Sequence, residues 1–156
     1  MVWFLASQVF TLERVIKKMI DLERLKKQLV IDEGLELKPY RCSADKLTIG
    51  VGRNIQEVGI TKEEAMVLLE NDIARVAGEC SRAFPWFLDL SAERKEAVIN
   101  LVFNMGLSKF QQFKKTIAFI EAGDFERAGT ELLDSNYARQ VGKRSERVAN
   151  MLAGED

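Results

Sequence analysis

The chain has 156 residues, 47% of them hydrophobic and 30% charged, a composition typical of one globular domain and unlike a disordered segment. Its 23 lysines and arginines nearly balance 24 aspartates and glutamates, which indicates neither a nucleic-acid-binding surface nor an acidic tail. The absence of histidine excludes histidine-based triads and most zinc enzymes, so acid–base catalysis near neutral pH falls to Asp, Glu, Cys, Lys or Tyr.

Two cysteines, Cys42 and Cys80, lie far apart and lack CxxC spacing, so we expect two free thiols and no disulfide scaffold. No apolar run reaches the roughly 18 residues that a membrane span needs. The apolar first twelve residues lack a basic region and a cleavage site, so we do not expect a signal peptide. We also expect no metal site and no cofactor.

The first predicted element is a long amphipathic helix. Hydrophobic residues recur at spacings of three and four from Leu12 to Leu29, and this pattern predicts one helix ending near Asp32, with Gly34 as its stop. Residues 1–18 allow three interpretations. They are a partner-docking or membrane-surface extension, an apolar cap packed on the body, or sequence upstream of a start at Met19.

A hairpin is predicted next. The stretch K-L-T-I-G-V-G-R at 46–53 alternates apolar and small or polar residues, as a strand does. We expect residues 39–42 and 47–52 to pair around a turn at 43–46. Two glycines on the polar face either leave room for something to approach the backbone closely or only relieve sheet twist.

The rest of the chain is predicted to be helical. Thr61 and Glu64 form a capping box that opens a helix to about Cys80. Ser91 caps a helix that Gly106 ends, and we expect it to be buried nearly all round from Ala97 onward. Shorter helices are predicted at 110–122, 124–133 and 143–152. These elements predict an α+β, mostly helical fold with a small hairpin lobe, a connecting helix and a helical C-terminal lobe.

Two features carry candidate chemistry. Glu33 lies at the junction of the first helix and the hairpin, where the negative end of the helix dipole suits a general acid, although most carboxylates at helix ends are solvated surface groups. Asn100 and Asn104 interrupt an apolar helix beside Phe103. Buried amides need partners, so they either bond to the backbone or line a cleft for a polar ligand such as a sugar.

The string I-D-E-G-L-E-L-K-P-Y-R-C-S-A-D-K-L-T-I-G-V-G-R-N at 31–54 resembles the active-site segment of phage-type lysozymes (glycoside hydrolase family 24). That family shows a Glu, eight residues, an Asp or Cys, five residues and a Thr, which here are Glu33, Cys42 and Thr48. The resemblance continues through G-I-T-K-E-E-A at 59–65, A-V-I-N-L-V-F-N-M-G at 97–106 and S-N-Y-A-R-Q-V-G-K-R-S-E-R-V at 135–148. It covers about residues 19–152, and three motifs in order make it specific.

The resemblance implies a lysozyme-like two-lobe fold. It divides the chain into an extension at 1–18, an N-terminal lobe at 19–60, a connecting helix at 61–80 and a helical lobe at 81–156, with 19–156 as one lysozyme domain. It also implies an endolysin muramidase that hydrolyses the β-1,4 bond between N-acetylmuramic acid and N-acetylglucosamine and so lyses the host. The implied partner is the peptidoglycan glycan strand, with no nucleic acid and no membrane span. We expect a monomer in the host cytoplasm that reaches the wall after release.

The resemblance also implies site roles. Glu33 would protonate the leaving oxygen, and Thr48 would help to place the attacking water. Phe103 and Asn104 resemble sugar-contacting residues, and Arg144 resembles an arginine that pairs with the catalytic Glu, although by itself it reads as a surface cation. Asn100 and Gln140 complete the expected substrate-binding set.

Cys42 stands where many family members carry Asp. A thiol titrates near 8.5 and a carboxylate near 4, so an unperturbed Cys42 is mostly neutral at pH 7 and the two-carboxylate scheme is in doubt. A neighbouring cation would change this by lowering its pKa. Cys42 orients or deprotonates water, or attacks directly, and Asp45 in the adjoining turn is a reserve carboxylate at the wrong spacing.

Two other functions compete with hydrolysis. A lytic transglycosylase uses one Glu and forms an anhydro sugar without water, whereas Cys and Thr at water-handling positions favour hydrolysis. A cell-wall-binding module with a dead site has no need for Glu33, Thr48 and Arg144 together.

Overall fold

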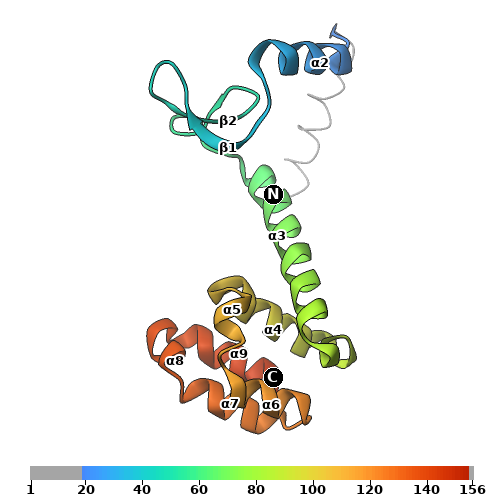
Figure 1. Cartoon of the computed structure of the whole chain (residues 1–156), viewed down its shortest axis with the longest axis vertical. Coiled ribbons are helices and arrows are strands. Elements are labelled where there is room, and N and C mark those ends of the chain that lie inside the picture. The colour runs from blue at the N-terminus through green and yellow to red at the C-terminus, as the bar shows by residue number, and fades with distance from the viewer. Residues whose placement is uncertain (1–18, 155–156) are drawn as a thin grey trace, which may run out of the picture. The chain divides into compact units, whose positions relative to one another are not determined.

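The computed structural model describes residues 19–154, and the chain divides into two compact units, residues 1–61 and residues 62–156 (Figure 1). We call residues 19–61 the hairpin unit and residues 62–154 the helical unit, and describe each by itself. Among residues 19–154, no helix is both long enough and apolar enough to cross a membrane.

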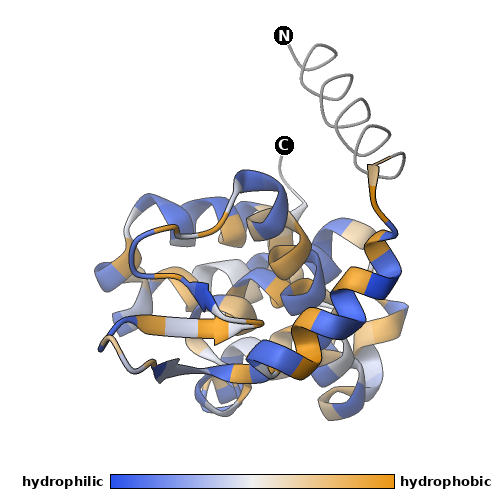
Figure 2. Ribbon diagram, turned by 90° about the horizontal axis from the view of Figure 1, so that it is seen from above, coloured by the Kyte–Doolittle hydropathy of each residue, from blue (hydrophilic) through white to orange (hydrophobic). Residues whose placement is uncertain are grey.

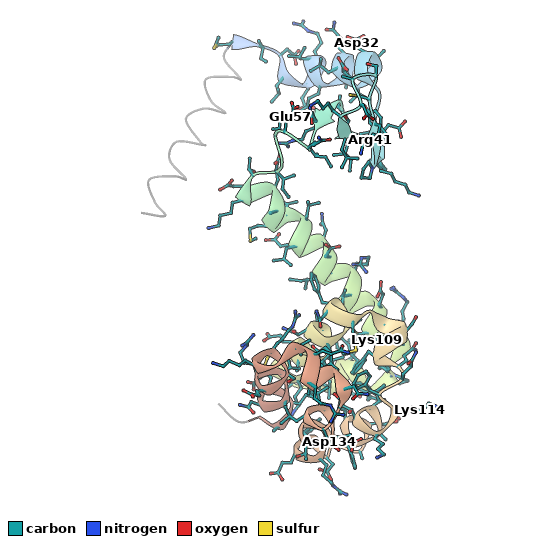
Figure 3. All side chains as sticks on the ribbon, turned by 90° about the vertical axis from the view of Figure 1, so that its left-hand side faces the viewer. Asp32, Arg41, Glu57, Lys109, Lys114 and Asp134 are labelled. Carbon is teal, nitrogen blue, oxygen red and sulfur yellow. The ribbon has the colours of Figure 1, made fainter. Side chains whose placement is uncertain are left out.

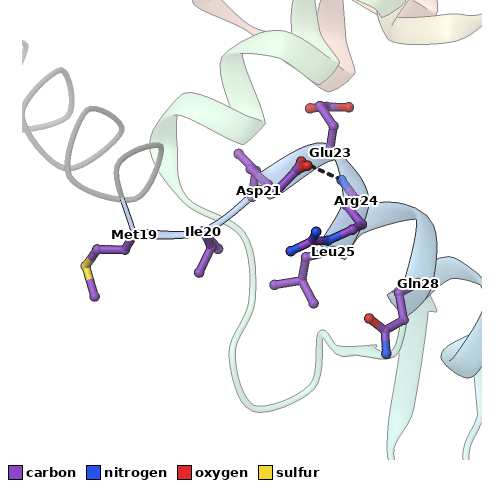
Figure 4. Close-up of a pocket in the computed structure, with 8 residues that line it drawn as sticks. Met19, Ile20, Asp21, Glu23, Arg24, Leu25 and Gln28 are labelled. Atoms are coloured by element: carbon purple, nitrogen blue, oxygen red, sulfur yellow. Dashed lines mark hydrogen bonds between the residues drawn. The ribbon is translucent and has the colours of Figure 1, made fainter.

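The hairpin unit begins with helix α2 (Leu22–Glu33), along which charged and apolar residues follow each other in short runs (Figure 2). Asp21 caps the helix, because its Oδ1 accepts a hydrogen bond of 3.0 Å from the backbone N–H of Arg24 (Figure 4). Gly34, with φ of 78°, ends it. The predicted single helix running through this point is therefore wrong, because a capped helix starts afresh at Leu22. The part of that prediction before Met19 lies outside the described residues.

A three-stranded antiparallel sheet follows, with strands β1 (Glu36–Arg41), β2 (Leu47–Gly50) and β3 (Arg53–Asn54) in that order. Thr48 on the central strand lies opposite Tyr40 on one side and Asn54 on the other. The β1–β2 pairing is irregular between Glu36 and Tyr40. The predicted hairpin is confirmed. Strand β3 was not predicted, because two residues are too short to show an alternating pattern.

The helical unit consists of one 3₁₀ helix and seven α-helices. In chain order they are α3 (Lys62–Ala83), the 3₁₀ helix η1 (Pro85–Asp89), α4 (Ala92–Met105), α5 (Leu107–Phe110), α6 (Lys114–Glu121), α7 (Phe125–Leu133), α8 (Asn136–Val141) and α9 (Lys143–Ala153). Ser91 caps α4 and Gly106 ends it, as predicted. The predicted helix at 110–122 corresponds to α6, which begins only at Lys114, and the helices α5 and α8 were not predicted. The α+β, mostly helical fold class is confirmed.

The buried core belongs to the helical unit. Its large fully buried side chains come from helices along the whole unit: Phe110, Leu101, Ile120, Leu132, Leu152, Val98, Val102 and Val148. Helix α4 contributes only one face to this core. Phe103, on its other side, is 42% exposed. The prediction that α4 is buried nearly all round is therefore wrong. A continuous run of apolar residues does not guarantee burial when the neighbouring helices cover one side of the helix only.

Candidate active site

Glu33 is the last residue of α2, and its exposed side chain lies against the turn between β2 and β3. The contact involves Gly52, at which an added Cβ would lie 3.3 Å from Glu33 Oε2. The chain reaches this arrangement because Gly34 stops the helix and the strands then fold back as a sheet. The carboxyl group is thus open to solvent at a helix end and lies beside the β2–β3 turn.

Cys42 follows β1 and is half-buried. The pKa of its thiol is lowered from the ordinary value, first by a hydrogen bond from the backbone of Lys46 and then by one from the backbone of Ala44; partial burial opposes them and the Thr48 side chain adds a smaller contribution. Donors that favour the thiolate are what a nucleophile or base needs. The sequence pointed to a cation for this effect, whereas backbone groups of the β1–β2 turn provide it.

Thr48 is the buried polar residue of the hairpin unit, with 3% of its surface exposed. Its Oγ1 donates a 3.0 Å hydrogen bond to the backbone oxygen of Lys46. The same side chain interacts with the Cys42 thiol. The structure therefore brings Cys42 and Thr48 together and holds the threonine hydroxyl in a fixed position.

Asp45, the reserve carboxylate, is occupied elsewhere in the turn. It has a φ of 56°, and its carboxylate lies 3.6 Å from the guanidinium of Arg41. Arg41 also donates a 2.9 Å hydrogen bond to the Asp45 backbone oxygen. Asp45 thus shapes the turn that presents the backbone of Lys46 to Cys42.

In the helical unit, Arg144 of α9 is held by Asn100 of α4. Its Nε and Nη2 donate hydrogen bonds of 3.1 and 2.9 Å to Asn100 Oδ1, and Nη2 also approaches the Asn100 backbone oxygen at 3.5 Å. Both residues line a groove of about 350 Å³ together with Phe103. The remaining lining is mostly apolar and comes from α3 and α4: Leu69, Ile73, Glu96 and Ile99.

Asn104 and Gln140 do not line this groove. Asn104 is exposed on α4, and Gln140 is exposed on α8, where it lines a second groove of about 440 Å³. Lys109 and Lys114 lie on this second groove (Figure 3). Of the five predicted substrate-binding residues, the structure thus gathers Asn100, Phe103 and Arg144.

Tyr137, also on the second groove, has a hydroxyl that is buried and makes no hydrogen bond within the described part of the chain. Burial raises the pKa of Tyr137, and the charge of Arg144 opposes this. Among residues 19–154, no group of three acidic or thiol side chains is placed to hold a metal ion. A further hollow of about 780 Å³ at the start of α2 contains none of the predicted site residues (Figure 4).

Two features of the site were not predicted from the sequence. One is the contact of Gly52 with Glu33, although the pair of glycines in T-I-G-V-G-R was the signal. The other is the hydrogen bond between Asn100 and Arg144, for which a sequence separation of 44 left no local pattern. The predicted pairing of Arg144 with Glu33 joins the two units and stays a prediction.

Comparison with known proteins gives a consistent answer. Residues 31–151 match the family model for phage lysozyme. An endolysin from the Acyrthosiphon pisum secondary endosymbiont phage 1 is 33% identical over 72% of this chain and 77% of its own length.

Two further relatives come from different settings. A probable T4-type lysozyme 2 from Dictyostelium discoideum is 29% identical over 81% of this chain and 92% of its own length. The pre-baseplate central spike protein Gp5 of Enterobacteria phage T4 is 29% identical over 78% of this chain but only 26% of its own length. The same domain therefore occurs both alone and inside a larger protein.

Proposed function

The chain belongs to the phage lysozyme family, and we propose from this premise that Glu33, Cys42 and Thr48 are the residues that perform its chemistry. The protein is a muramidase of the endolysin type, a glycoside hydrolase that acts on peptidoglycan. The observation that carries the residue assignment is the contact between Cys42 and Thr48, in the same small sheet whose β2–β3 turn supports Glu33.

Glu33 is the general acid. Its carboxyl proton passes to the glycosidic oxygen as the bond from that oxygen to C1 of N-acetylmuramic acid breaks, and positive charge develops on the sugar ring. Water then adds to C1 and gives up a proton, which yields a reducing end. The exposed position of Glu33 at the end of α2 supports this role, because a glycan strand can reach it.

Cys42 and Thr48 act on the attack at C1, whereas Glu33 acts on the leaving oxygen. The hydrogen bonds that lower the pKa of Cys42 support a thiolate that accepts the proton from water or attacks C1 directly. The buried Thr48 hydroxyl, fixed on the Lys46 backbone oxygen, is suited to orienting that water. Thiolate chemistry thus takes the place of the second carboxylate.

The helical unit contributes the sugar-binding residues. Phe103 offers a half-exposed ring and Arg144 offers hydrogen-bond donors in the same groove, a combination that suits a sugar with apolar and hydroxyl faces. Asn100 acts through Arg144, which it holds. Asn104 and Gln140 are exposed and remain in the proposed binding set on the strength of the family resemblance.

The deciding experiment is clearing of purified peptidoglycan, with mass analysis of the products, by the wild type and by Glu33→Gln. Glu36→Gln, an exposed carboxylate on β1, serves as the matched control. We expect reducing muropeptides from the wild type and the control, and a loss of about a thousandfold in Glu33→Gln. Equal clearing by both would contradict the role of Glu33. Anhydro products would point to a transglycosylase, and no clearing by the wild type would point to a binding module.

Cys42 is tested separately by two substitutions. Cys42→Asp should keep activity and move its pH profile toward acid, because a carboxylate ionises well below a thiol. Cys42→Ala should lose most of the activity. If Cys42→Asp were as inactive as Cys42→Ala, the assignment of Cys42 would be wrong.

We also propose that the protein acts as a monomer that is made in the host cytoplasm and reaches the wall after release. The relatives that consist of little more than this domain support a self-sufficient protein. Light scattering after size exclusion, at micromolar concentration, should give the mass of one chain of 17.7 kDa.

A further inference from the structure

Gly52 has a second reason to be glycine, besides its backbone conformation. Its φ of 67° lies in the left-handed region, which alone favours glycine. An added Cβ would in addition lie 3.3 Å from Glu33 Oε2, 3.7 Å from its Cδ and 3.8 Å from its Cβ. A side chain here would therefore press on the carboxyl group that is assigned to proton donation.

Gly50 provides an internal comparison two residues earlier. Its φ is 68°, almost the same as that of Gly52, but an added Cβ would meet nothing within 4 Å. The two glycines therefore share a positive φ and differ in what a side chain would touch. Any effect that a methyl group has at Gly52 and lacks at Gly50 reports the contact with Glu33.

We propose that Gly52 is a positioning residue for the acid step, whose missing side chain leaves Glu33 Oε2 open to the glycosidic oxygen of the substrate. This inference rests on the proposed role of Glu33. Proton transfer requires the two oxygens to approach within about 2.6–3.2 Å. A Cβ at residue 52, 3.3 Å from Oε2, would either occupy the space that the glycosidic oxygen needs or turn the carboxyl group away from the substrate.

The size of the effect follows from how steeply proton transfer depends on geometry. An added Cβ at 3.3 Å requires the Glu33 carboxyl group to move by a few tenths of an ångström, and a misplacement of about 1 Å in a catalytic group can cost about a hundredfold in rate. The binding of the rest of the glycan strand does not involve this contact. Gly52→Ala should therefore lower kcat by about three- to tenfold and leave KM within about twofold.

The experiment compares Gly52→Ala with Gly50→Ala in the full chain, with steady-state kinetics on solubilised peptidoglycan and thermal unfolding of both variants. Both should show a similar fall in Tm, because both place alanine at the same φ. Only Gly52→Ala should lose kcat. If the two variants lose kcat equally, the effect is backbone strain and the proposal is overturned.

A second substrate separates proton donation from general damage to the site. A 2,4-dinitrophenyl β-glycoside of N-acetylglucosaminyl-N-acetylmuramic acid releases a leaving group that needs no proton from an acid. On this substrate Gly52→Ala should match the wild type to within about 1.5-fold, since only the acid step is hindered. An equal loss on both substrates would overturn the proposal.

Glu33→Gln in the same assays distinguishes the two levels of inference. If it is inactive on peptidoglycan and recovers on the dinitrophenyl substrate, Glu33 is the acid, and the Gly52 result then stands or fails by itself. If Glu33→Gln keeps full activity on peptidoglycan, the proposed function fails first. Should alanine prevent folding, asparagine at the two glycines replaces it, because asparagine tolerates positive φ and still carries a Cβ.

Discussion

The hairpin unit and the helical unit differ in how many buried side chains they contain and in which proposed functional residues they carry. Among residues 19–61 the buried side chain is that of Thr48, whereas the whole apolar core cluster comes from residues between Val76 and Leu152. The proposed acid, thiol and water-orienting residues all lie in the hairpin unit. The comparison teaches that the residues proposed for the chemistry lie outside the apolar core, whose packing is concentrated in the helical unit.

The largest expected effect on stability comes from removing core volume. Leu132→Ala, at a fully buried position of α7, should lower the free energy of unfolding by about 2–5 kcal/mol, because it leaves a cavity. Leu37→Ala, 81% exposed on β1, should change it by less than about 0.5 kcal/mol. Urea unfolding followed by circular dichroism measures both. Similar losses at the two positions would remove the contrast between the units.

The two thiols should differ next most strongly. Hydrogen bonds lower the pKa of Cys42, whereas burial raises that of Cys80 to about 11. Only the thiolate reacts with iodoacetamide, so near pH 8 we expect Cys42 to be labelled at least about a hundredfold faster than Cys80 in the folded protein. Mass spectrometry of peptides at timed intervals measures the two rates.

The pH dependence of labelling has a defined sign for each thiol. The Cys42 rate should level off below the pH at which a free cysteine does, because its thiolate forms earlier. The Cys80 rate should still be rising as the pH approaches 11. Equal rates near pH 8, or a Cys42 midpoint above that of free cysteine, would argue against the turn as a source of thiolate stabilisation.

A smaller effect is expected where the helical unit meets substrate. Asn100→Ala removes the acceptor that holds Arg144, and should raise KM by about tenfold with a smaller change in kcat, since one pair of hydrogen bonds is worth about 1–2 kcal/mol. Asn100→Asp keeps an acceptor at the same place and should stay within about threefold of the wild type. A kcat loss with unchanged KM would place Arg144 in the reaction itself.

The smallest effect concerns a helix cap. Ser91→Ala should lower the free energy of unfolding by about 1 kcal/mol, because the N–H of Arg94 loses its acceptor. Ser108→Ala, at an exposed serine inside α5, serves as the control and should have almost no effect. The activity per folded molecule should be unchanged in both. A loss of activity from Ser91→Ala would show that the helical unit influences chemistry beyond binding.

Local signals in the sequence predicted much of the fold. The Ser91 cap and the Gly106 stop define α4, and the alternation at 46–53 defines the strand β2, because each is a contact among neighbouring residues. The break at Asp21 was missed, since the apolar periodicity continues through it and hides the cap. The exposed side of α4 was missed for another reason: burial depends on which helices lie beside it.

In the candidate site, too, contacts within the hairpin could be predicted and the details of its surroundings could not. The sequence predicted that residues 39–42 pair with residues 47–52, and this pairing places Cys42 near Thr48. The origin of the lowered pKa of Cys42 could not be predicted, since it depends on where the backbone N–H groups of the turn point. The difference between Gly50 and Gly52 could not be predicted either, because both occupy alternate positions of one strand pattern. Only the position of Glu33, at the end of α2, distinguishes them.

The distribution of the core also has a consequence for how the protein is made. The N-terminal part of a chain leaves the ribosome first, so Glu33, Cys42 and Thr48 emerge before any helix of the core. Val148 and Leu152, near the end of the chain, are fully buried parts of that core. A nascent chain halted before Lys143 would carry all three proposed catalytic residues and still lack the last helix of its core. Lytic activity should therefore be acquired only once α9 is complete.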